Sequence, residues 1–186
     1  ISGHVKRPGV YEYPSGMLIS DLIYEVAGGM RGDKGLKAVV PGGSSVPILR
    51  ADMIDGVTMD SASLQEAGSL IGTAGMLILE EGTDMVAFLR RVAHFYRHES
   101  CGQCTPCREG TGWMEKILRR IEVGEGRMRD LDLLLEITEN IEGGRTICAL
   151  ADGAAWPVRN TIERFRDEFE ARCKTSSVTV EEEVAA

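Results

Sequence analysis

The stretch His98-Glu-Ser-Cys-Gly-Gln-Cys-Thr-Pro-Cys-Arg-Glu-Gly-Thr-Gly112 places three cysteines at steps of three residues, Cys101, Cys104 and Cys107. A [4Fe-4S] cubane has four iron corners, and each corner takes one thiolate. A tight loop with cysteines at positions i, i+3 and i+6 reaches three of those corners. The stretch therefore predicts three ligands of a [4Fe-4S] cluster and requires a fourth ligand from elsewhere in the chain.

Cys148, in the segment Thr146-Ile-Cys-Ala-Leu150, is the candidate for the fourth corner. It falls in the connection between the third and fourth of four predicted helices. In an up-down bundle with short loops, that connection lies at the end where the second helix begins. The sequence thus predicts a cluster held by Cys101, Cys104, Cys107 and Cys148.

Two other uses of these cysteines remain open on spacing alone. Structural zinc also takes four cysteines, although usually as two separated Cys-x-x-Cys pairs. A redox thiol pair or a disulfide is the third interpretation, and the odd count of five cysteines with no mark of secretion disfavours a disulfide framework. Cys173 has no cysteine near it in the sequence and is interpreted as a thiol that is not a ligand.

Other residues in this half of the chain have simpler interpretations. His94 and His98 are four residues apart, but the glutamate of a zinc-protease helix is missing between them, so we interpret both as helix-surface residues. Trp113 and Trp156 fall in helical apolar stripes and are expected in the core. For Arg108 two roles are open: a cation that favours the reduced cluster, or a surface ion pair with a nearby glutamate.

The apolar period changes to 3.6 residues after Gly82-Thr83, and this change predicts helices from there on. We expect Thr83 as the first N-cap and Pro157 in the first turn of the last helix. The short connections favour a four-helix bundle. The predicted helices are 84–98, from after Cys107 to Gly124, 130–141 and 154–172.

The residues before Gly82 are rich in glycine and in short runs typical of strands. Residues 1–5 and 10–13 flank Lys6-Arg-Pro-Gly9 and predict a hairpin. A short helix with Ser20 as its N-cap is expected to end at Gly28-Gly29, and strands follow at 37–40 and 76–80. This order predicts a β-grasp-like α+β unit.

The whole chain is therefore expected to be α+β. It comprises a β-grasp-like domain at 1–82, a four-helix bundle that binds a [4Fe-4S] cluster at 83–173, and a disordered tail at 174–186. Because the chain begins at Ile1 in strand-like residues and without Met, we expect a piece of a longer polypeptide.

Composition excludes some classes of partner. The net charge of −8 argues against a nucleic-acid surface, which needs clustered Lys and Arg. No run of residues approaches the roughly 20 apolar residues of a membrane helix. We therefore expect a soluble chain that reaches a membrane only through partners.

Four stretches together resemble one family: Ser2-Gly-His-Val-Lys-Arg-Pro-Gly-Val-Tyr-Glu12, Val40-Pro-Gly-Gly-Ser-Ser45, the cysteine stretch, and Thr146-Ile-Cys-Ala-Leu150 with Ala154-Ala-Trp-Pro157. This family is the NADH-binding flavoprotein subunit of respiratory complex I, an NADH-quinone oxidoreductase, in its C-terminal part. The resemblance implies a soluble-ligand-binding β-grasp domain and a [4Fe-4S] domain, with Cys101, Cys104, Cys107 and Cys148 as ligands.

The resemblance also implies a function. Such subunits oxidise NADH on FMN and pass electrons singly through the cluster. The flavin and NADH domain has no counterpart in this chain, so no residue is assigned to FMN or NADH and none is expected to be catalytic. The implied partners are other complex I subunits, especially the thioredoxin-like [2Fe-2S] subunit and the large iron-sulfur subunit. The implied location is peripheral, on the cytoplasmic face of the cell membrane, or on the matrix side in mitochondria.

Two other functions are consistent with the sequence. One is the flavin subunit of a soluble NAD-linked hydrogenase or formate dehydrogenase, built from the same modules. The other is a zinc-stabilised interaction module.

Overall fold

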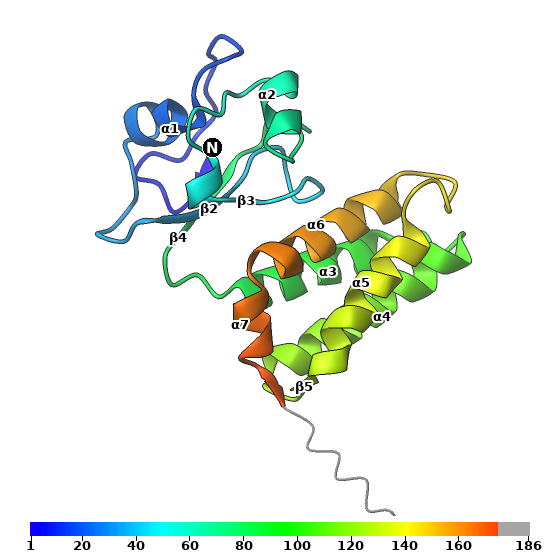
Figure 1. Ribbon diagram of the computed structural model, residues 1–186. Helices are drawn as coiled ribbons and strands as arrows, with labels where there is room; N and C mark the ends of the chain where they lie inside the picture. The colour runs from blue at the N-terminus through cyan, green and yellow to red at the C-terminus, as the bar shows by residue number, and fades with distance from the viewer. Residues whose placement is uncertain (175–186) are drawn as a thin grey trace, which may run out of the picture.

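The computed structural model describes residues 1–174, which form a small mixed sheet and a group of helices (Figure 1). The sheet has the strand order β1-β4-β2-β3. Strand β1 runs parallel to β4, and the other two pairs are antiparallel. The strands are β1 (Ser2–Gly3), β2 (Leu36–Val40), β3 (Leu49–Arg50) and β4 (Leu77–Glu80).

The predicted hairpin at the start of the chain is wrong. Ser2 and Gly3 pair with Leu77 and Ile78 of β4 instead of with residues 10–13, which form no strand. The approach to β4 depends on Gly3, whose φ is +89° and at which a Cβ atom would lie 2.2 Å from the carbonyl oxygen of Ile78. In the segment 10–13, by contrast, Val10 is fully exposed. No residue of 10–13 belongs to either buried hydrophobic cluster.

The other predicted elements of this part are confirmed in outline, although Ser20, the predicted N-cap, lies inside its helix and Leu18 is the N-cap residue. Helix α1 (Ile19–Asp21) continues into a π-helical turn (Leu22–Val26), and Gly28 and Gly29 follow with φ values of +76° and +81°. Strands β2 and β4 begin within one residue of the predicted positions. Three elements were not predicted: strand β3, a 3₁₀ turn (Ala51–Met53) and helix α2 (Ser61–Glu66). Asp60 caps α2 by accepting a bond from Ser63 N at 3.0 Å.

Four long helices form the second half of the chain, and α3 and α5 each contact both α4 and α6. A short helix and a two-residue pair of strands complete this part, in which β5 pairs with β6. The elements are α3 (Met85–Glu99), α4 (Thr105–Glu122), β5 (Gly126–Arg127), α5 (Met128–Ile141), α6 (Leu150–Arg164), α7 (Arg166–Glu170) and β6 (Cys173–Lys174). Lys174, which was expected in the tail, is therefore paired; the rest of the predicted tail, 175–186, lies outside the described residues.

The starts of all four long helices differ from the prediction, and α5 begins at Met128, two residues before the predicted start at 130. Asp84, not Thr83, caps α3, and its carboxylate accepts a bond from Ala87 N at 3.0 Å. Helix α4 begins before Cys107 because Pro106 fits its first turn. Helix α6 begins at Leu150, so Pro157 lies inside the helix rather than in its first turn, and the helix breaks at Phe165.

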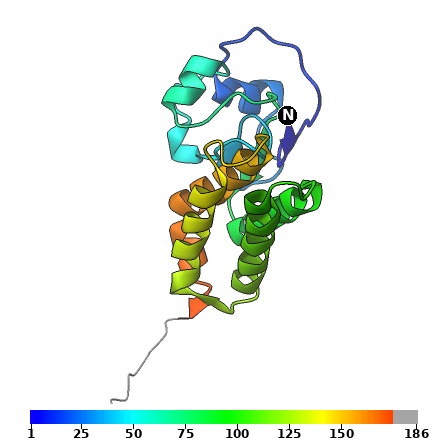
Figure 2. The ribbon, with the colours of Figure 1, turned by 90° about the vertical axis from the view of Figure 1, so that its right-hand side faces the viewer.

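Both faces of the sheet are covered. Ala38, Val40 and Leu79 share a buried cluster with the long helices. The alternate residues Val39 and Ile78 lie in a second cluster with the π-helical turn and α2. The two views show the sheet at one side of the helices (Figures 1 and 2). Because the first cluster spans both halves, the division of the chain at residue 82 stays a prediction.

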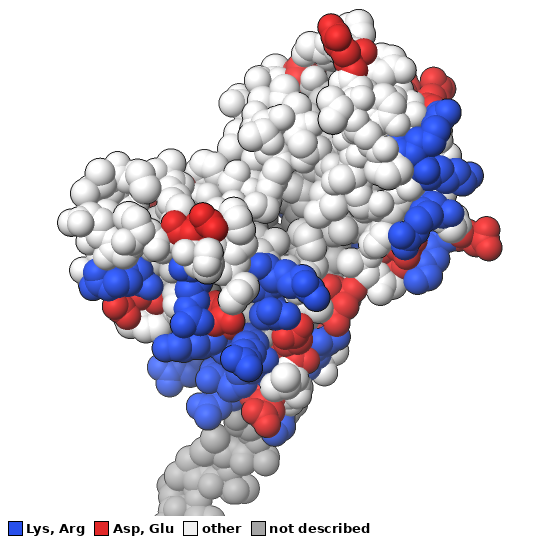
Figure 3. All heavy atoms as spheres, turned by 180° about the vertical axis from the view of Figure 1, so that it is seen from behind, with Lys and Arg blue, Asp and Glu red and all other residues white. Residues whose placement is uncertain are grey.

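Charge is distributed unevenly over the surface. Seen from behind, Lys and Arg side chains gather over the helices toward the end that carries β5 (Figure 3). Within residues 1–174, no helix is both long enough and apolar enough to cross a membrane.

Candidate iron-sulfur site

The first cysteine loop joins α3 to α4. Gly102 reverses the chain with a φ of +79°, and Cys104 is the N-cap residue of α4. Cys107 follows in the first helical turn, so its side chain lies on the same side as that of Cys104. Cys107 is buried, Cys104 is half-buried and Cys101 is exposed. The loop thus presents three thiols over a range of depths at the positive end of α4.

The second cysteine loop joins α5 to α6 and carries Cys148, which is exposed. The backbone N–H of Ile147 donates a hydrogen bond to Cys104 Sγ at 3.4 Å. The two loops therefore touch at one end of the helices, as the up-down order predicted (Figure 1).

Contacts on both flanks fix the second loop. The carboxylate of Asp152 in α6 accepts a bond from Gly143 N at 2.7 Å, and Thr146 Oγ1 donates to the carbonyl of Cys148 at 2.9 Å. Arg145 Nε donates to the carbonyl of Glu139 at 3.0 Å. Arg159 and Glu142 form an ion pair beneath the loop. Contacts within the loop and with the flanking helices therefore fix the position of Cys148.

The thiols suit a cluster. All five cysteines are free. No three His, Cys, Asp or Glu side chains of the described part converge on one position that would hold a single metal ion. A cubane requires no such convergence, because its four thiolates bind four separate irons.

Arg108 forms the surface ion pair that was one of its two predicted roles, and it also bonds to the first cysteine loop. Its Nη1 donates to the carbonyl oxygen of Gly102 at 2.6 Å, and its Nε lies 3.0 Å from a carboxylate oxygen of Glu109. The guanidinium therefore anchors the first cysteine loop and also forms a surface ion pair. Its effect on a bound cluster stays a prediction.

Cys173 lies away from the other cysteines. It belongs to β6, at the β5 end of the helices, whereas the cysteine loops lie at the opposite end (Figure 1). Burial, together with the negative charges of Asp130 and Glu170, raises the pKa of the Cys173 thiol. A raised pKa disfavours the thiolate form that binds iron.

Three other predicted residues have clear positions. His94 and His98 are exposed and face Glu115 and Glu99, at 3.7 and 2.9 Å, consistent with a surface role. The core prediction for Trp113 is wrong, because this side chain is 52% exposed. The other residues of the predicted apolar stripe in α4 are buried: Met114, Ile117, Leu118 and Ile121.

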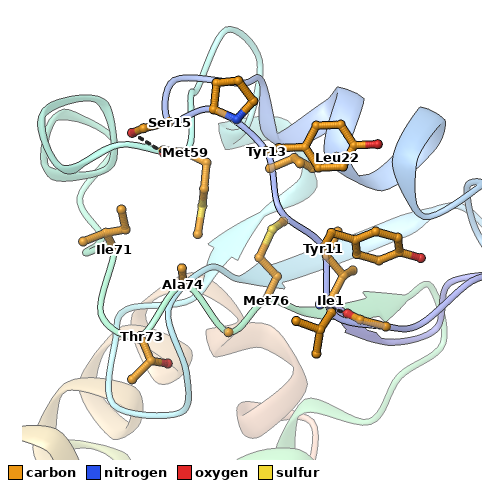
Figure 4. Close-up of a pocket in the computed structure, with 14 residues that line it drawn as sticks. Ile1, Tyr11, Tyr13, Ser15, Leu22, Met59, Ile71, Thr73, Ala74 and Met76 are labelled. Atoms are coloured by element: carbon orange, nitrogen blue, oxygen red, sulfur yellow. Dashed lines mark hydrogen bonds between the residues drawn. The ribbon is translucent and has the colours of Figure 1, made fainter.

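A cavity of about 520 Å³ lies in the sheet part (Figure 4). Tyr11, Tyr13, Met59 and Met76 are among the residues that line it, and no cysteine does. It is therefore separate from the candidate iron-sulfur site.

Several residues of the site were not predicted from the sequence. Ser100 contacts Cys107, Asp152 fixes the second loop, and the amide of Ile147 contacts Cys104. A single serine, aspartate or backbone amide forms no sequence motif that would mark it as part of an iron-sulfur site. Closeness to a cysteine in the sequence was the available signal for Ser100 and Ile147.

Two families match separate parts of the chain. Residues 87–172 match the family described as the NADH-ubiquinone oxidoreductase-F iron-sulfur binding region, and all four candidate ligands fall in this range. Residues 1–49 match the SLBB domain.

Curated relatives match nearly the whole chain. The F subunit of the NADH-quinone oxidoreductase of Rickettsia conorii is 49% identical over 179 residues, which are 96% of this chain and 42% of that protein. The corresponding protein of Rickettsia bellii is 48% identical over 173 residues, 92% of this chain and 41% of that protein. The chain thus spans about two fifths of the length of these relatives.

Solved structures of an NAD⁺-reducing [NiFe]-hydrogenase have a similar fold. The H₂-reduced form superposes with a TM-score of 0.81 at 30% identity and covers 93% of this chain and 28% of the hydrogenase chain. The air-oxidised form gives the same TM-score and identity. The mixed helix and sheet architecture therefore recurs in this NAD⁺-reducing hydrogenase.

Proposed function

Because this chain belongs to the F-subunit family of the NADH-quinone oxidoreductases, we propose that it is the part of such a subunit that relays single electrons. The relay is a [4Fe-4S] cluster held by Cys101, Cys104, Cys107 and Cys148. The observation that carries this proposal is the contact between the two cysteine loops, from Ile147 N to Cys104 Sγ. This contact supports the proposal because Ile147 is the residue before Cys148.

We also propose that the chain comprises a β-grasp-like domain and a four-helix bundle. The sheet with α1 and α2 is a β-grasp-like domain, supported by the SLBB match at its start. The four long helices form the bundle that holds the cluster, supported by the contacts of α3 and α5 with both α4 and α6.

The residues of this chain have distinct tasks in the relay. A bound cubane gains and loses one electron at a time. The four thiolates hold it, while the positive end of α4 and the N–H of Ile147 stabilise negative charge on it. Arg108 anchors the loop around Gly102, and Asp152 fixes the loop that carries Cys148.

The remaining steps belong to the rest of the protein and to its partners. FMN and NADH bind to the part of the protein that this chain does not include. The next acceptors are other complex I subunits, especially the thioredoxin-like [2Fe-2S] subunit and the large iron-sulfur subunit. The assembled protein is peripheral to the membrane, on the cytoplasmic or the matrix side. Identity of 49% with the Rickettsia conorii protein, against 30% with the hydrogenase, favours complex I over the hydrogenase alternative.

The test uses the full-length protein, purified without oxygen. We expect about four irons and four sulfides bound by this part, and an EPR signal of a reduced [4Fe-4S] cluster that appears after NADH is added. A colourless protein that contains zinc in place of iron would contradict the proposal. A cluster that dithionite reduces but NADH does not would contradict its position in the NADH pathway.

A further inference from the structure

The side chain of Ser100 lies against the sulfur of Cys107. Ser100 follows the last residue of α3, and its backbone N–H closes the helix by donating to the carbonyl of Tyr96 at 3.1 Å. This closure fixes the residue, and its Oγ lies 3.2 Å from Cys107 Sγ. The hydroxyl also accepts a bond from Gly102 N at 3.4 Å. Hydrogen bonds to α3 and to the cysteine loop therefore both fix the position of Ser100 beside Cys107.

The direction of the bond follows from the chemistry of a ligated cysteine. Between a hydroxyl and a thiol either atom can donate. A cysteine that binds iron is a thiolate without a proton, so it only accepts. The Ser100 hydroxyl must then donate to Cys107 Sγ, while its oxygen still accepts from Gly102 N. The result is a chain of donors that runs from the loop amide through the hydroxyl to the sulfur.

The surroundings strengthen this bond. Cys107 is only 7% exposed, so little water competes for its sulfur. Hydrogen bonds are electrostatically stronger where the local dielectric constant is low. Cys107 is also the most buried of the four candidate ligands, so a hydrogen bond to its sulfur is the least exposed to water.

We propose that the hydroxyl of Ser100 donates to the Cys107 ligand and raises the reduction potential of the cluster. Reduction adds one negative charge to the cluster, and hydrogen bonds to its sulfurs stabilise that charge. Ser100 is thus a positioning residue that acts on the cluster through Cys107. The inference rests on the proposed function, because it takes Cys107 to be a ligand.

Two substitutions at Ser100 separate the hydroxyl from the side chain that carries it. Ser100→Ala removes the donor, and Ser100→Thr keeps it. A matched control is Thr111→Val, because Thr111 Oγ1 donates to the backbone carbonyl of Cys107 at 2.7 Å and not to its sulfur. Valine keeps the shape of that buried threonine and removes its hydroxyl.

The experiment is an EPR-monitored redox titration of the full-length protein and these three variants, with iron and sulfide measured in each. We expect a lower midpoint potential in Ser100→Ala and unchanged potentials in Ser100→Thr and Thr111→Val. In pulsed ENDOR after transfer to D₂O, the unsubstituted protein should show an exchangeable proton coupled to the cluster that Ser100→Ala lacks.

An unchanged potential in Ser100→Ala at full cluster content overturns this inference and leaves the proposed function intact. Cluster loss in Ser100→Ala alone also overturns it, because the hydroxyl would then serve assembly and not potential. A missing cluster in the unsubstituted protein overturns the proposed function itself.

Discussion

The backbone N–H of Ile147 donates a hydrogen bond to the sulfur of Cys104, two residues that are 43 positions apart in the sequence. The bond joins the loop before α6 to the N-cap residue of α4. Because N–H groups that point at a thiolate stabilise its charge, the contact both positions the second loop and prepares Cys104 for metal binding. It makes the two cysteine loops parts of one site.

Arg108 allows a test of charge against anchoring. Arg108→Ala removes the cation near the cluster and the bond to the Gly102 carbonyl, and we expect a lower midpoint potential of the cluster. Arg108→Lys keeps the charge but not the planar fork of donors. A drop in potential in Arg108→Ala that Arg108→Lys does not share would assign the effect to charge. If neither variant changes the potential in a redox titration, Arg108 only forms surface contacts.

Two glycines of α4 are expected to respond in opposite ways to alanine. At Gly110 a Cβ atom would lie 2.5 Å from Cγ2 of Ile141 in α5, so Gly110→Ala overpacks the contact between the helices. We expect a loss of about 1–3 kcal/mol in the free energy of unfolding. At Gly112 nothing lies within 4 Å of such an atom, and Gly112→Ala should gain up to about 1 kcal/mol because alanine favours helix.

Chemical denaturation of the two variants and the unsubstituted chain checks this pair of predictions. Equal stability of the two variants would mean that α4 does not pack on α5 as closely as described.

The carboxyl group of Asp84 makes the free energy of unfolding depend on pH. Burial alone raises the pKa of its carboxyl, but the bond from Ala87 N and the ion pair with Arg172 outweigh burial, so the pKa lies below its usual value. A lowered pKa stabilises the fold above the unfolded value of 3.8, and this contribution disappears as the pH falls from there through the folded pKa. Asp84→Ala should cost about 1 kcal/mol at pH 7, because α3 loses its N-cap.

The difference between Asp84→Ala and the unsubstituted chain should shrink below pH 4. Thermal unfolding measured from pH 7 to pH 3 gives this comparison. Both proteins are prepared without a cluster, because acid destroys the cluster and would itself change the unfolding temperature. A difference that stays constant with pH would show that the carboxylate charge at Asp84 does not matter.

The sequence identified Cys101, Cys104 and Cys107 as candidate ligands because a [4Fe-4S] cluster requires closely spaced thiolates. Cys101, Cys104 and Cys107 are close in the sequence, and the up-down order of the helices was enough to direct Cys148 to the same end. The long helices were also predicted, because each carries an apolar face over several turns.

Details that depend on tertiary contact were not predictable. The pairing of β1 with β4 joins Gly3 to Ile78, and a strand of two residues has no pattern of its own. Either Thr83 or Asp84 has the side chain of an N-cap, and only the path of the chain selects Asp84. The contact of Ser100 with Cys107 likewise depends on where α3 ends.

The central claim is that Cys148 is the fourth ligand, and Cys148→Ser in the full-length protein tests it most directly. Cys173→Ser is the matched control, because it removes a cysteine at the far end of the helices. Metal analysis with Mössbauer and EPR spectroscopy should find an intact [4Fe-4S] cluster in Cys173→Ser and a lost or altered cluster in Cys148→Ser. An unchanged cluster in Cys148→Ser, or a cluster lost in Cys173→Ser, would contradict the account.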